Sequence, residues 1–381
     1  MYKIAFLIIS FLIVACSSIR IRENITVNKN EDWLYRGGDI ENTNTSKSKA
    51  ILNPPFAILW DYDTEVGYPS NSLSVSDGIL FSSNLKGEVF AIDVTTGKSI
   101  GRFSTPGKTS YSTPIIFNDN IIIAFSSSNR YSILSYNILQ GEINWKRQLG
   151  WIKSSPILID EEIIVCATNG KIYKLDALSG NKIWEYSEGG DNIERKSFNT
   201  SPVACNQFVV AGNINYYLYA VNISDGKLRW KFKTNGAIYS DASVFENKIF
   251  FASDDLNFYC IDTAGNLLWK KPINTKSLSS STFYNDKVIT AGIDGTVFAL
   301  EKNTGDSLWT YQTNGAVWAS PLLQGDKIFI GSFDRNFYCI DANDGNLLWK
   351  YELDNRIRTN AVVWKDYIFT ACDDKSIYCF K

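Results

Sequence analysis

Short apolar runs recur along most of this 381-residue chain, and turn-forming residues separate them. Residues 328–341 are one example, with an apolar run, a polar turn and a second apolar run that ends at Asp341. Runs of this length that are rich in aromatic and β-branched residues predict β-strands. Beyond the N-terminus we find no long stretch with helical spacing of apolar residues, so the pattern predicts an all-β protein.

The pattern is a repeat marked by tryptophan at intervals of 39 to 46 residues, with Gly101 in one of the marked positions. A glycine lies four residues before most of these tryptophans, and Gly97 lies four residues before Gly101. We expect each tryptophan to offer a large apolar face to the neighbouring unit. The tryptophans that we predict to dock units together are Trp60, Trp145, Trp184, Trp230, Trp269, Trp309 and Trp349.

Each unit of about 40 residues divides into four predicted strands joined by turns. Ser-Pro pairs such as Ser155-Pro156 lead into the innermost strand, and Asn169-Gly170 is typical of a tight hairpin turn. Radial repetition of four-stranded units predicts a β-propeller, with a linear solenoid as the alternative. The last unit lacks its fourth strand, which residues 56–60 can supply. Closure of the ring leaves no free edge, so we predict an eight-bladed propeller of antiparallel blades over 56–381.

The N-terminus has the features of an exported lipoprotein. A basic start, an apolar run over residues 4–14 and Ala15-Cys16 follow one another in the order of a signal peptide and a bacterial lipobox. We therefore predict a signal peptide over 1–15, lipidation of Cys16 and a polar tether over 16–32; a buried N-terminal strand is the alternative. Ser17 after the cysteine resembles an outer-membrane sorting signal of Gram-negative bacteria.

Composition excludes several classes of function. The chain has no histidine, so neither a Ser–His–Asp triad nor a His-ligated zinc site can form. A net charge of −2 without a basic stripe argues against nucleic acid as a partner. Cys260, Cys339 and Cys379 share one repeat position where other units have alanine, which favours small buried residues over disulfides.

The phrase Tyr-x-x-Asp-x-x-(Thr/Asp)-Gly-x-x-x-Trp resembles the PQQ-type propeller repeat over residues 33–381. That family includes quinoprotein alcohol dehydrogenases and BamB, the lipoprotein of the outer-membrane β-barrel assembly machinery. The lead-in over 33–55, beginning Trp33-Leu34-Tyr35, resembles the segment before the first blade in exported members. Length and lipobox bring the chain close to the BamB-like branch, whereas the lead-in is more typical of general PQQ-like repeat lipoproteins.

An enzyme hypothesis follows from the same resemblance, because quinoprotein dehydrogenases hold PQQ and calcium over the propeller axis. Those enzymes are longer and often have adjacent cysteines, which this chain lacks. Its Asp and Glu residues fall mainly at turn positions, where turn stabilisation is the simpler role. We therefore predict no catalytic residue, no cofactor and no bound metal.

The units diverge where the chain enters each innermost strand, at one mouth of the channel. Aromatic, basic and amide side chains of the kinds enriched in binding sites occur there, although water-facing residues also vary freely. Trp151 is close by in sequence, and a polar loop over 187–196 is a second divergent feature, either a partner contact or a tolerated insertion. The candidate binding ring consists of Tyr111, Lys153, Asn199, Tyr239, Trp318 and Arg358, with Pro69 and Leu278 completing the positions.

These observations lead to one main hypothesis and two alternatives. The main hypothesis is a monomeric, non-catalytic lipoprotein of the bacterial envelope that binds protein partners, in outer-membrane protein assembly by the BamB-like resemblance. It would lie on the outer membrane and face the periplasm in a Gram-negative host. The alternatives are a PQQ-dependent oxidoreductase and a sensor that binds a small molecule or glycan through the mouth aromatics.

Overall fold

The computed structural model describes residues 18–381 except residue 22 and residues 106–107, 127–130 and 190–195. The predicted signal peptide and Cys16 lie outside the described residues, as does most of the 187–196 loop. The described part contains strands and turns without helices, which confirms the all-β prediction.

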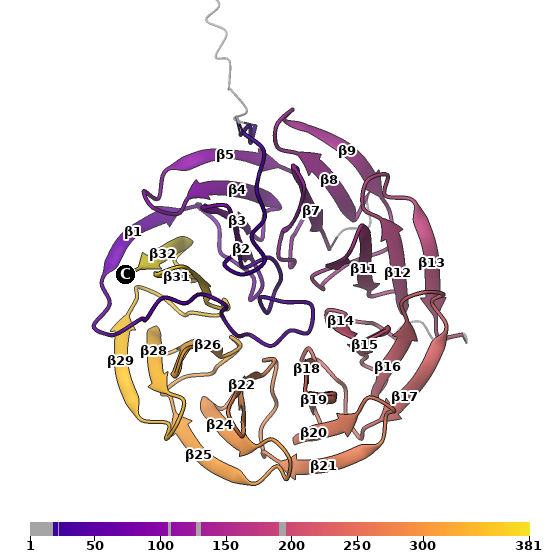
Figure 1. The fold of residues 1–381 in the computed structure, drawn as a ribbon, viewed down its shortest axis with the longest axis vertical. Helices are drawn as coiled ribbons and strands as arrows, with labels where there is room; N and C mark the ends of the chain where they lie inside the picture. Colours follow the sequence, from indigo (N-terminus) through magenta and orange to yellow (C-terminus); the bar gives the residue numbers. More distant parts are fainter. Residues whose placement is uncertain (1–17, 22, 106–107, 127–130, 190–195) are drawn as a thin grey trace, which may run out of the picture.

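Eight four-stranded antiparallel sheets surround a central channel, which confirms the predicted eight-bladed propeller (Figure 1). Blades are numbered here from the first complete one, and each runs from its innermost to its outermost strand. Blade 1 is β2 (Leu73–Ser76), β3 (Ile79–Ser83), β4 (Glu88–Asp93) and β5 (Ser99–Ser104); blade 2 is β6 (Ile115–Phe117), β7 (Asn120–Ala124), β8 (Ile133–Asn137) and β9 (Glu142–Arg147). Blade 3 is β10 (Ile157–Ile159), β11 (Glu162–Ala167), β12 (Lys171–Asp176) and β13 (Lys182–Ser187); blade 4 is β14 (Val203–Cys205), β15 (Phe208–Gly212), β16 (Tyr217–Asn222) and β17 (Leu228–Lys233). Blade 5 is β18 (Ser243–Phe245), β19 (Lys248–Ser253), β20 (Asn257–Asp262) and β21 (Leu267–Pro272); blade 6 is β22 (Thr282–Tyr284), β23 (Lys287–Ala291), β24 (Thr296–Glu301) and β25 (Ser307–Gln312). Blade 7 is β26 (Leu322–Gln324), β27 (Lys327–Gly331), β28 (Asn336–Asp341) and β29 (Leu347–Glu352); blade 8 is β30 (Val362–Trp364), β31 (Tyr367–Ala371), β32 (Ser376–Phe380) and β1 (Ile58–Asp63).

The N-terminal strand β1 closes the ring by pairing with β32, with Trp60 opposite Cys379. The strand begins at Ile58, two residues later than the sequence suggested. Phe56 instead packs its ring against Trp349 of blade 7, with ring centroids 5.2 Å apart. Both ends of the chain therefore contribute to blade 8, and its sheet has no unpaired strand at the closure.

Burial follows the position of each strand in its blade. The inner strand β30 is buried throughout, whereas the outer strand β29 alternates between half-buried and exposed residues. The core consists of apolar layers between neighbouring blades, such as Val210 and Leu218 of blade 4 against Ile249 and Tyr259 of blade 5. A ring built this way is rigid, because each sheet buries both faces against its neighbours.

The tryptophans contact the next blade in a repeated arrangement. Nε1 of Trp145 in blade 2 donates a 3.0 Å hydrogen bond to the carbonyl of Ala177 in blade 3. The same ring covers Gly180, whose φ of +69° and lack of Cβ allow the close approach. Trp60, Trp184, Trp230, Trp269 and Trp309 make the equivalent hydrogen bonds to the next blade.

Candidate functional site

A ring of hydrogen bonds lines the channel at the start of the inner strands. The backbone N–H of Thr113 donates to Ser155 Oγ, that of Ser155 to Ser201 Oγ, and that of Ser201 to Asp241 Oδ1, over 2.9, 3.0 and 2.9 Å. Blades 2 to 5 are thus joined in succession by the residue that precedes the proline or its equivalent, and Ser280, Ser320 and Asn360 join blades 6 to 8 in the same way. Asp241 is the one acidic member of this series, and it is buried.

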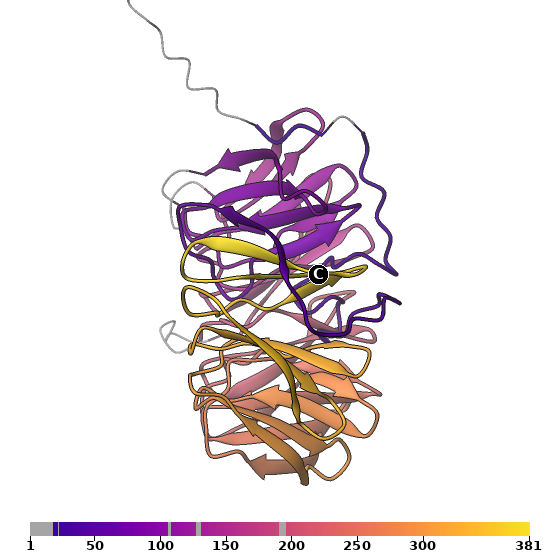
Figure 2. The same cartoon turned by 90° about the vertical axis from the view of Figure 1, so that its left-hand side faces the viewer.

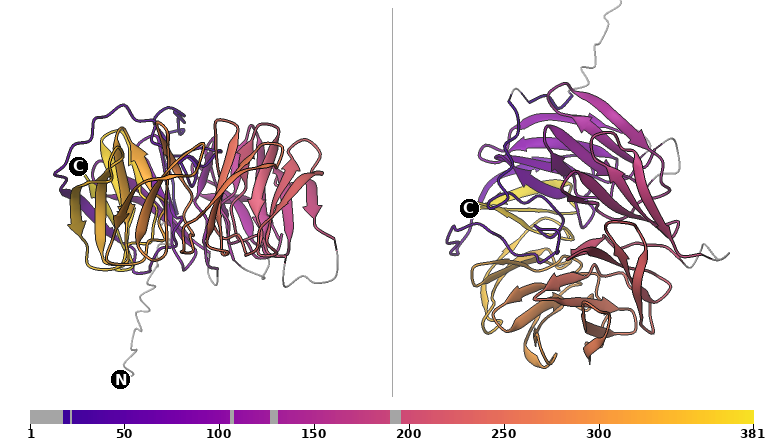
Figure 3. Two further views of the ribbon diagram at one scale, coloured as in Figure 1. Left: turned by 90° about the horizontal axis from the view of Figure 1, so that it is seen from below. Right: turned by 45° about the vertical axis from the view of Figure 1, so that its right-hand side comes forward.

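The lead-in covers one end of the channel, which we call the lead-in face (Figures 1 and 3). It crosses the ring by pairing with successive inner strands: Trp33 with Val75 of blade 1 and Thr45 with Leu323 of blade 7. Between these points its backbone carbonyls accept hydrogen bonds from Ala204 of blade 4 and Val244 of blade 5, over 2.8 and 2.9 Å. The segment that the sequence placed before the first blade is therefore a cover over the channel.

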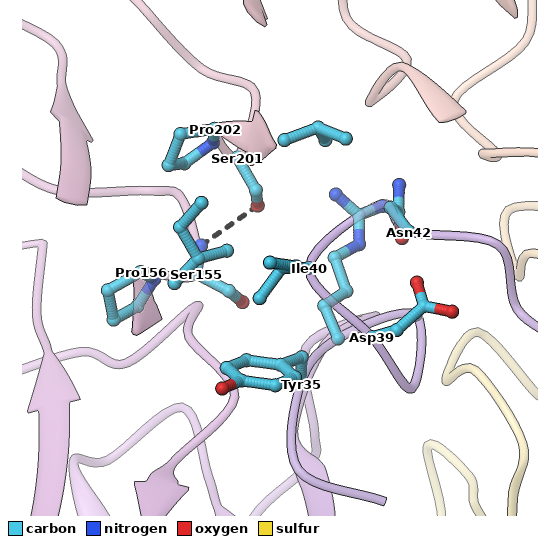
Figure 4. Close-up of a pocket in the computed structure, with 12 residues that line it drawn as sticks. Tyr35, Asp39, Ile40, Asn42, Ser155, Pro156, Ser201 and Pro202 are labelled. Carbon is cyan, nitrogen blue, oxygen red and sulfur yellow. Dashed lines mark hydrogen bonds between the residues drawn. The ribbon is translucent and has the colours of Figure 1, made fainter. Parts of the chain in front are cut away.

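A buried ion pair joins this cover to the channel. The guanidinium of Arg36 contacts the carboxylate of Asp241, and both side chains are almost fully excluded from solvent. Burial lowers the pKa of Arg36 to about 9, which leaves the group charged at neutral pH. Beside it, Tyr35 and Ile40 of the lead-in lie close to Pro156 and Pro202, the starts of two inner strands (Figure 4).

Two cavities of about 220 and 210 Å³ lie between the lead-in and the ends of inner strands in blades 2 and 3. Both are lined by Lys29, Leu34, Tyr35, Leu158 and Asp160. Their walls combine apolar side chains with charges of both signs. They are narrow spaces around the lead-in, and the hydrogen bond from Tyr35 to the Leu158 carbonyl (3.0 Å) crosses this region.

The candidate binding ring lies at the other end of the channel. The inner strands start at this end. Because each blade is a four-stranded meander, the turn between its second and third strands lies at the same end, and so does the connection from its outer strand to the next blade. We call this end the loop face; Figure 2 shows it on the side opposite the lead-in. Tyr111, Lys153 and Tyr239 are exposed, while Asn199, Trp318 and Arg358 are half-buried.

Two members of the ring meet on blades 7 and 8. The guanidinium of Arg358 lies 5.5 Å from the ring centroid of Trp318, and the Trp318 ring packs at a tilt of 46° against Phe333, with ring centroids 4.8 Å apart. Asp373 accepts a 2.5 Å hydrogen bond from Arg358 and holds the cation beside the aromatic pair. Phe333 and Asp373 occupy turns between second and third strands, which the sequence analysis did not consider. The same turn position has Leu85, Ile214 and Ile293 in other blades, so Phe333 alone does not depart from the repeat.

A related group lies on blades 5 and 6. Lys276 donates a 2.8 Å hydrogen bond to Asp254, in a turn at the same repeat position as Asp373. This bond and the charge of Asp254 raise the pKa of Lys276. Asn199 accepts from the Ser197 hydroxyl at 2.7 Å within its own loop. The loop face therefore presents separate aromatic and charged groups around the mouth, and a continuous ring of contacts is not formed among the described residues.

No three side chains of the His, Cys, Asp or Glu type gather closely enough in the described part to hold a metal ion. Cys166, Cys205, Cys260, Cys339, Cys372 and Cys379 are free and buried. None of the described elements is a helix of the length and apolarity needed to span a bilayer.

The fold and its repeats define the class of the protein, which is the PQQ-type eight-bladed propeller. Within that class, the family profile described as outer membrane protein assembly factor BamB matches residues 52–215 and 215–380. The matched residues cover most of the chain, so the protein belongs to the BamB family, as the repeat resemblance predicted.

Individual relatives are distant. BamB of Legionella pneumophila is 23% identical over 159 residues, which cover 40% of this chain and 41% of that protein. Tetrathionate hydrolase of Acidithiobacillus ferrooxidans is 24% identical over 258 residues, covering 65% of this chain and 46% of the enzyme. The chain thus spans less than half of the length of these curated relatives.

Solved structures show the same fold at low identity. BamB from Moraxella catarrhalis superposes with a TM-score of 0.73 at 16% identity, covering 86% of this chain and all of that one. A quinohemoprotein alcohol dehydrogenase from Comamonas testosteroni superposes with a TM-score of 0.77 at 13% identity, covering 93% of this chain and 81% of that one. The propeller alone does not separate a binding protein from an oxidoreductase.

Proposed function

We propose that the protein is a non-catalytic docking lipoprotein of the bacterial envelope that takes part in outer-membrane protein assembly. The observation that carries this proposal is the BamB family match over residues 52–380. The signal peptide and lipobox of the sequence supply export and an anchor at Cys16. In a Gram-negative host the propeller then faces the periplasm from the outer membrane.

The two ends of the channel support a binding role for the loop face. The lead-in occupies the other end through strand pairing and the Arg36–Asp241 ion pair. The loop face exposes Tyr239 and Trp151 at 38% and 50%, and large exposed aromatic side chains are the usual anchors of protein interfaces. The partner therefore docks on the loop face, with Trp318 and Arg358 within the contact.

Site-specific photocrosslinking in cells tests this proposal. A photoreactive phenylalanine analogue replaces Tyr239 or Trp318, and the control position is Leu308 on the outer strand β25, which is also exposed. We expect the two loop-face positions to give an adduct that mass spectrometry identifies as a component of the outer-membrane assembly machinery. Adducts at Leu308 alone, or none with that machinery, would contradict the proposal.

Titration of the mature chain with PQQ and calcium distinguishes the docking role from the alternative of a PQQ-dependent oxidoreductase. We expect no change in the melting temperature. Stoichiometric binding with a raised melting temperature would replace the docking role with quinoprotein chemistry, since a ligand that binds the folded state stabilises it.

A further inference from the structure

One of the docking positions between blades is occupied by a different part of the chain. Gly101 pairs with Ala91 across β4 and β5 in the register that Trp309 and Ala299 adopt in blade 6. It is therefore the tryptophan position of blade 1, without the side chain. The turn of blade 2 that would receive this tryptophan contains Gly141, with a φ of +75°.

Residues 18–20 fill the vacant position. A Cβ atom at Gly141 would lie 2.6 Å from Arg20 Nε, and one at Gly101 would lie 2.9 Å from both Ile19 Cα and the Ser18 carbonyl oxygen. Contacts that close mean that the segment is packed directly onto both glycines. A tryptophan at position 101 and the N-terminal segment exclude each other sterically.

The segment is held by burial and by hydrogen bonds. Ile19 is fully buried in the cluster that contains Phe103 and Tyr136 of blades 1 and 2. The N–H of Ile21 donates to the Ile138 carbonyl at 2.9 Å, and the Tyr136 hydroxyl donates to the Ile19 carbonyl at 3.2 Å. Residues 16–32 were expected to be a polar tether; where described, they lie on the propeller instead, because Ile19 and Ile25 have apolar sites to fill.

We infer that residues 18–21, which we call the strap, fix the orientation of the propeller, with the rim of blades 1 and 2 facing a lipid surface. This inference rests on the lipid anchor at Cys16 in the proposed function. Two residues span at most about 7 Å, so the Cα atom of Cys16, where the lipid is attached, can lie no farther than that from the Cα atom of Ser18. The strap leaves the ring between β5 and β9 (Figure 1). With that rim against the membrane, the loop face opens sideways to protein partners.

Depth-dependent quenching tests the orientation in the full lipidated chain. The six described cysteines are buried, so a fluorophore can be attached to a cysteine introduced by Glu142→Cys in blade 2 or, as control, by Leu308→Cys in blade 6. In vesicles with quencher-labelled headgroups, we expect several-fold stronger quenching at position 142. Equal quenching of membrane-bound protein would overturn the fixed orientation. Protein that does not associate with vesicles would overturn the anchor of the proposed function as well.

Gly101→Trp tests the strap independently of lipid. In the non-lipidated Cys16→Ser chain, the new side chain should displace the strap and raise the rate of tryptic cleavage after Arg20 by roughly tenfold or more. Ile19→Ser should raise the rate of cleavage too. In the Ile19→Ser background, Gly101→Trp should lower the melting temperature less than it does in the chain with an intact strap. The control Ile51→Ser removes an exposed side chain and should change neither quantity. Unchanged cleavage in both strap variants would overturn the inference.

Discussion

Arg36 of the lead-in forms an ion pair with Asp241, which precedes the inner strand of blade 5 at the wall of the channel. Blades 3 and 4 have Ser155 and Ser201 at the position of Asp241, and each serine hydroxyl accepts the same backbone hydrogen bond. The acidic residue is therefore an adaptation to the lead-in, and the ring itself needs only a hydrogen-bond acceptor at that point.

Removal of one partner of this pair should destabilise the protein strongly. We expect Arg36→Met to lower the free energy of unfolding by about 3–5 kcal/mol, because it leaves a buried carboxylate without its cation. Denaturant titration measures the loss. The double variant Arg36→Met, Asp241→Ser introduces the serine that blades 3 and 4 have at this position and should recover most of the lost free energy. A double variant no more stable than Arg36→Met would contradict this explanation.

Close packing of tryptophan on glycine should make the turn glycines irreplaceable. A Cβ atom at Gly180 would lie 2.5 Å from Cδ2 of Trp145, whereas Gly325 has a similar φ of +63° and open space around it. Both alanine variants incur the cost of a left-handed backbone, about 1–2 kcal/mol. Because of overpacking, Gly180→Ala should lower the free energy of unfolding by about 1–3 kcal/mol more than Gly325→Ala does, as measured by thermal unfolding. Equal losses at the two positions would show that the contact with Trp145 is unimportant.

The acidic turn residues on the loop face should contribute to acid stability. Asp334 accepts hydrogen bonds from the Tyr338 hydroxyl at 2.7 Å and from the N–H of Asn314 at 2.8 Å. Burial alone would raise the pKa of Asp334, but these bonds outweigh it and lower the pKa below the ordinary value of about 3.9. The carboxylate therefore stabilises the fold above about pH 4, and this contribution is lost as pH falls through the lowered pKa.

Asp334→Asn should accordingly be less stable at neutral pH, and its free energy of unfolding should depend less on pH below about 4. Urea titrations at neutral and acidic pH measure both effects. Asp61→Asn, at an exposed position of β1, is the matched control and should follow the parent protein. The hypothesis fails if the parent and the Asp334 variant lose stability in parallel as the solution is acidified.

The repeat made the propeller predictable, because each strand, turn and tryptophan is specified by residues within about 40 positions. The lead-in and strap contacts were not predictable in the same way, since Arg36 and Asp241 are far apart in the chain and only the folded ring brings them together. Both sites nevertheless left a signal: Asp241 is the one acidic residue in a series of serine, threonine and asparagine, and Gly101 interrupts the series of tryptophans. Departures from a repeat thus indicate where a segment outside the repeat is bound. The exposed residues of the loop face gave no such signal, because solvent tolerates many side chains there.

Burial should make the six described cysteines unreactive in the folded protein. It raises the pKa of the Cys205 thiol to about 11 and that of Cys260 to about 12, and only the thiolate attacks a disulfide reagent. In a Cys16→Ser chain at about pH 8 we expect no rapid reaction with Ellman's reagent, and six thiols should react after denaturation in guanidinium. The reductant-free and reduced proteins should also unfold at the same denaturant concentration, because no disulfide constrains the unfolded chain. Fewer than six thiols without reductant, together with a lower midpoint on reduction, would show a disulfide and contradict this prediction.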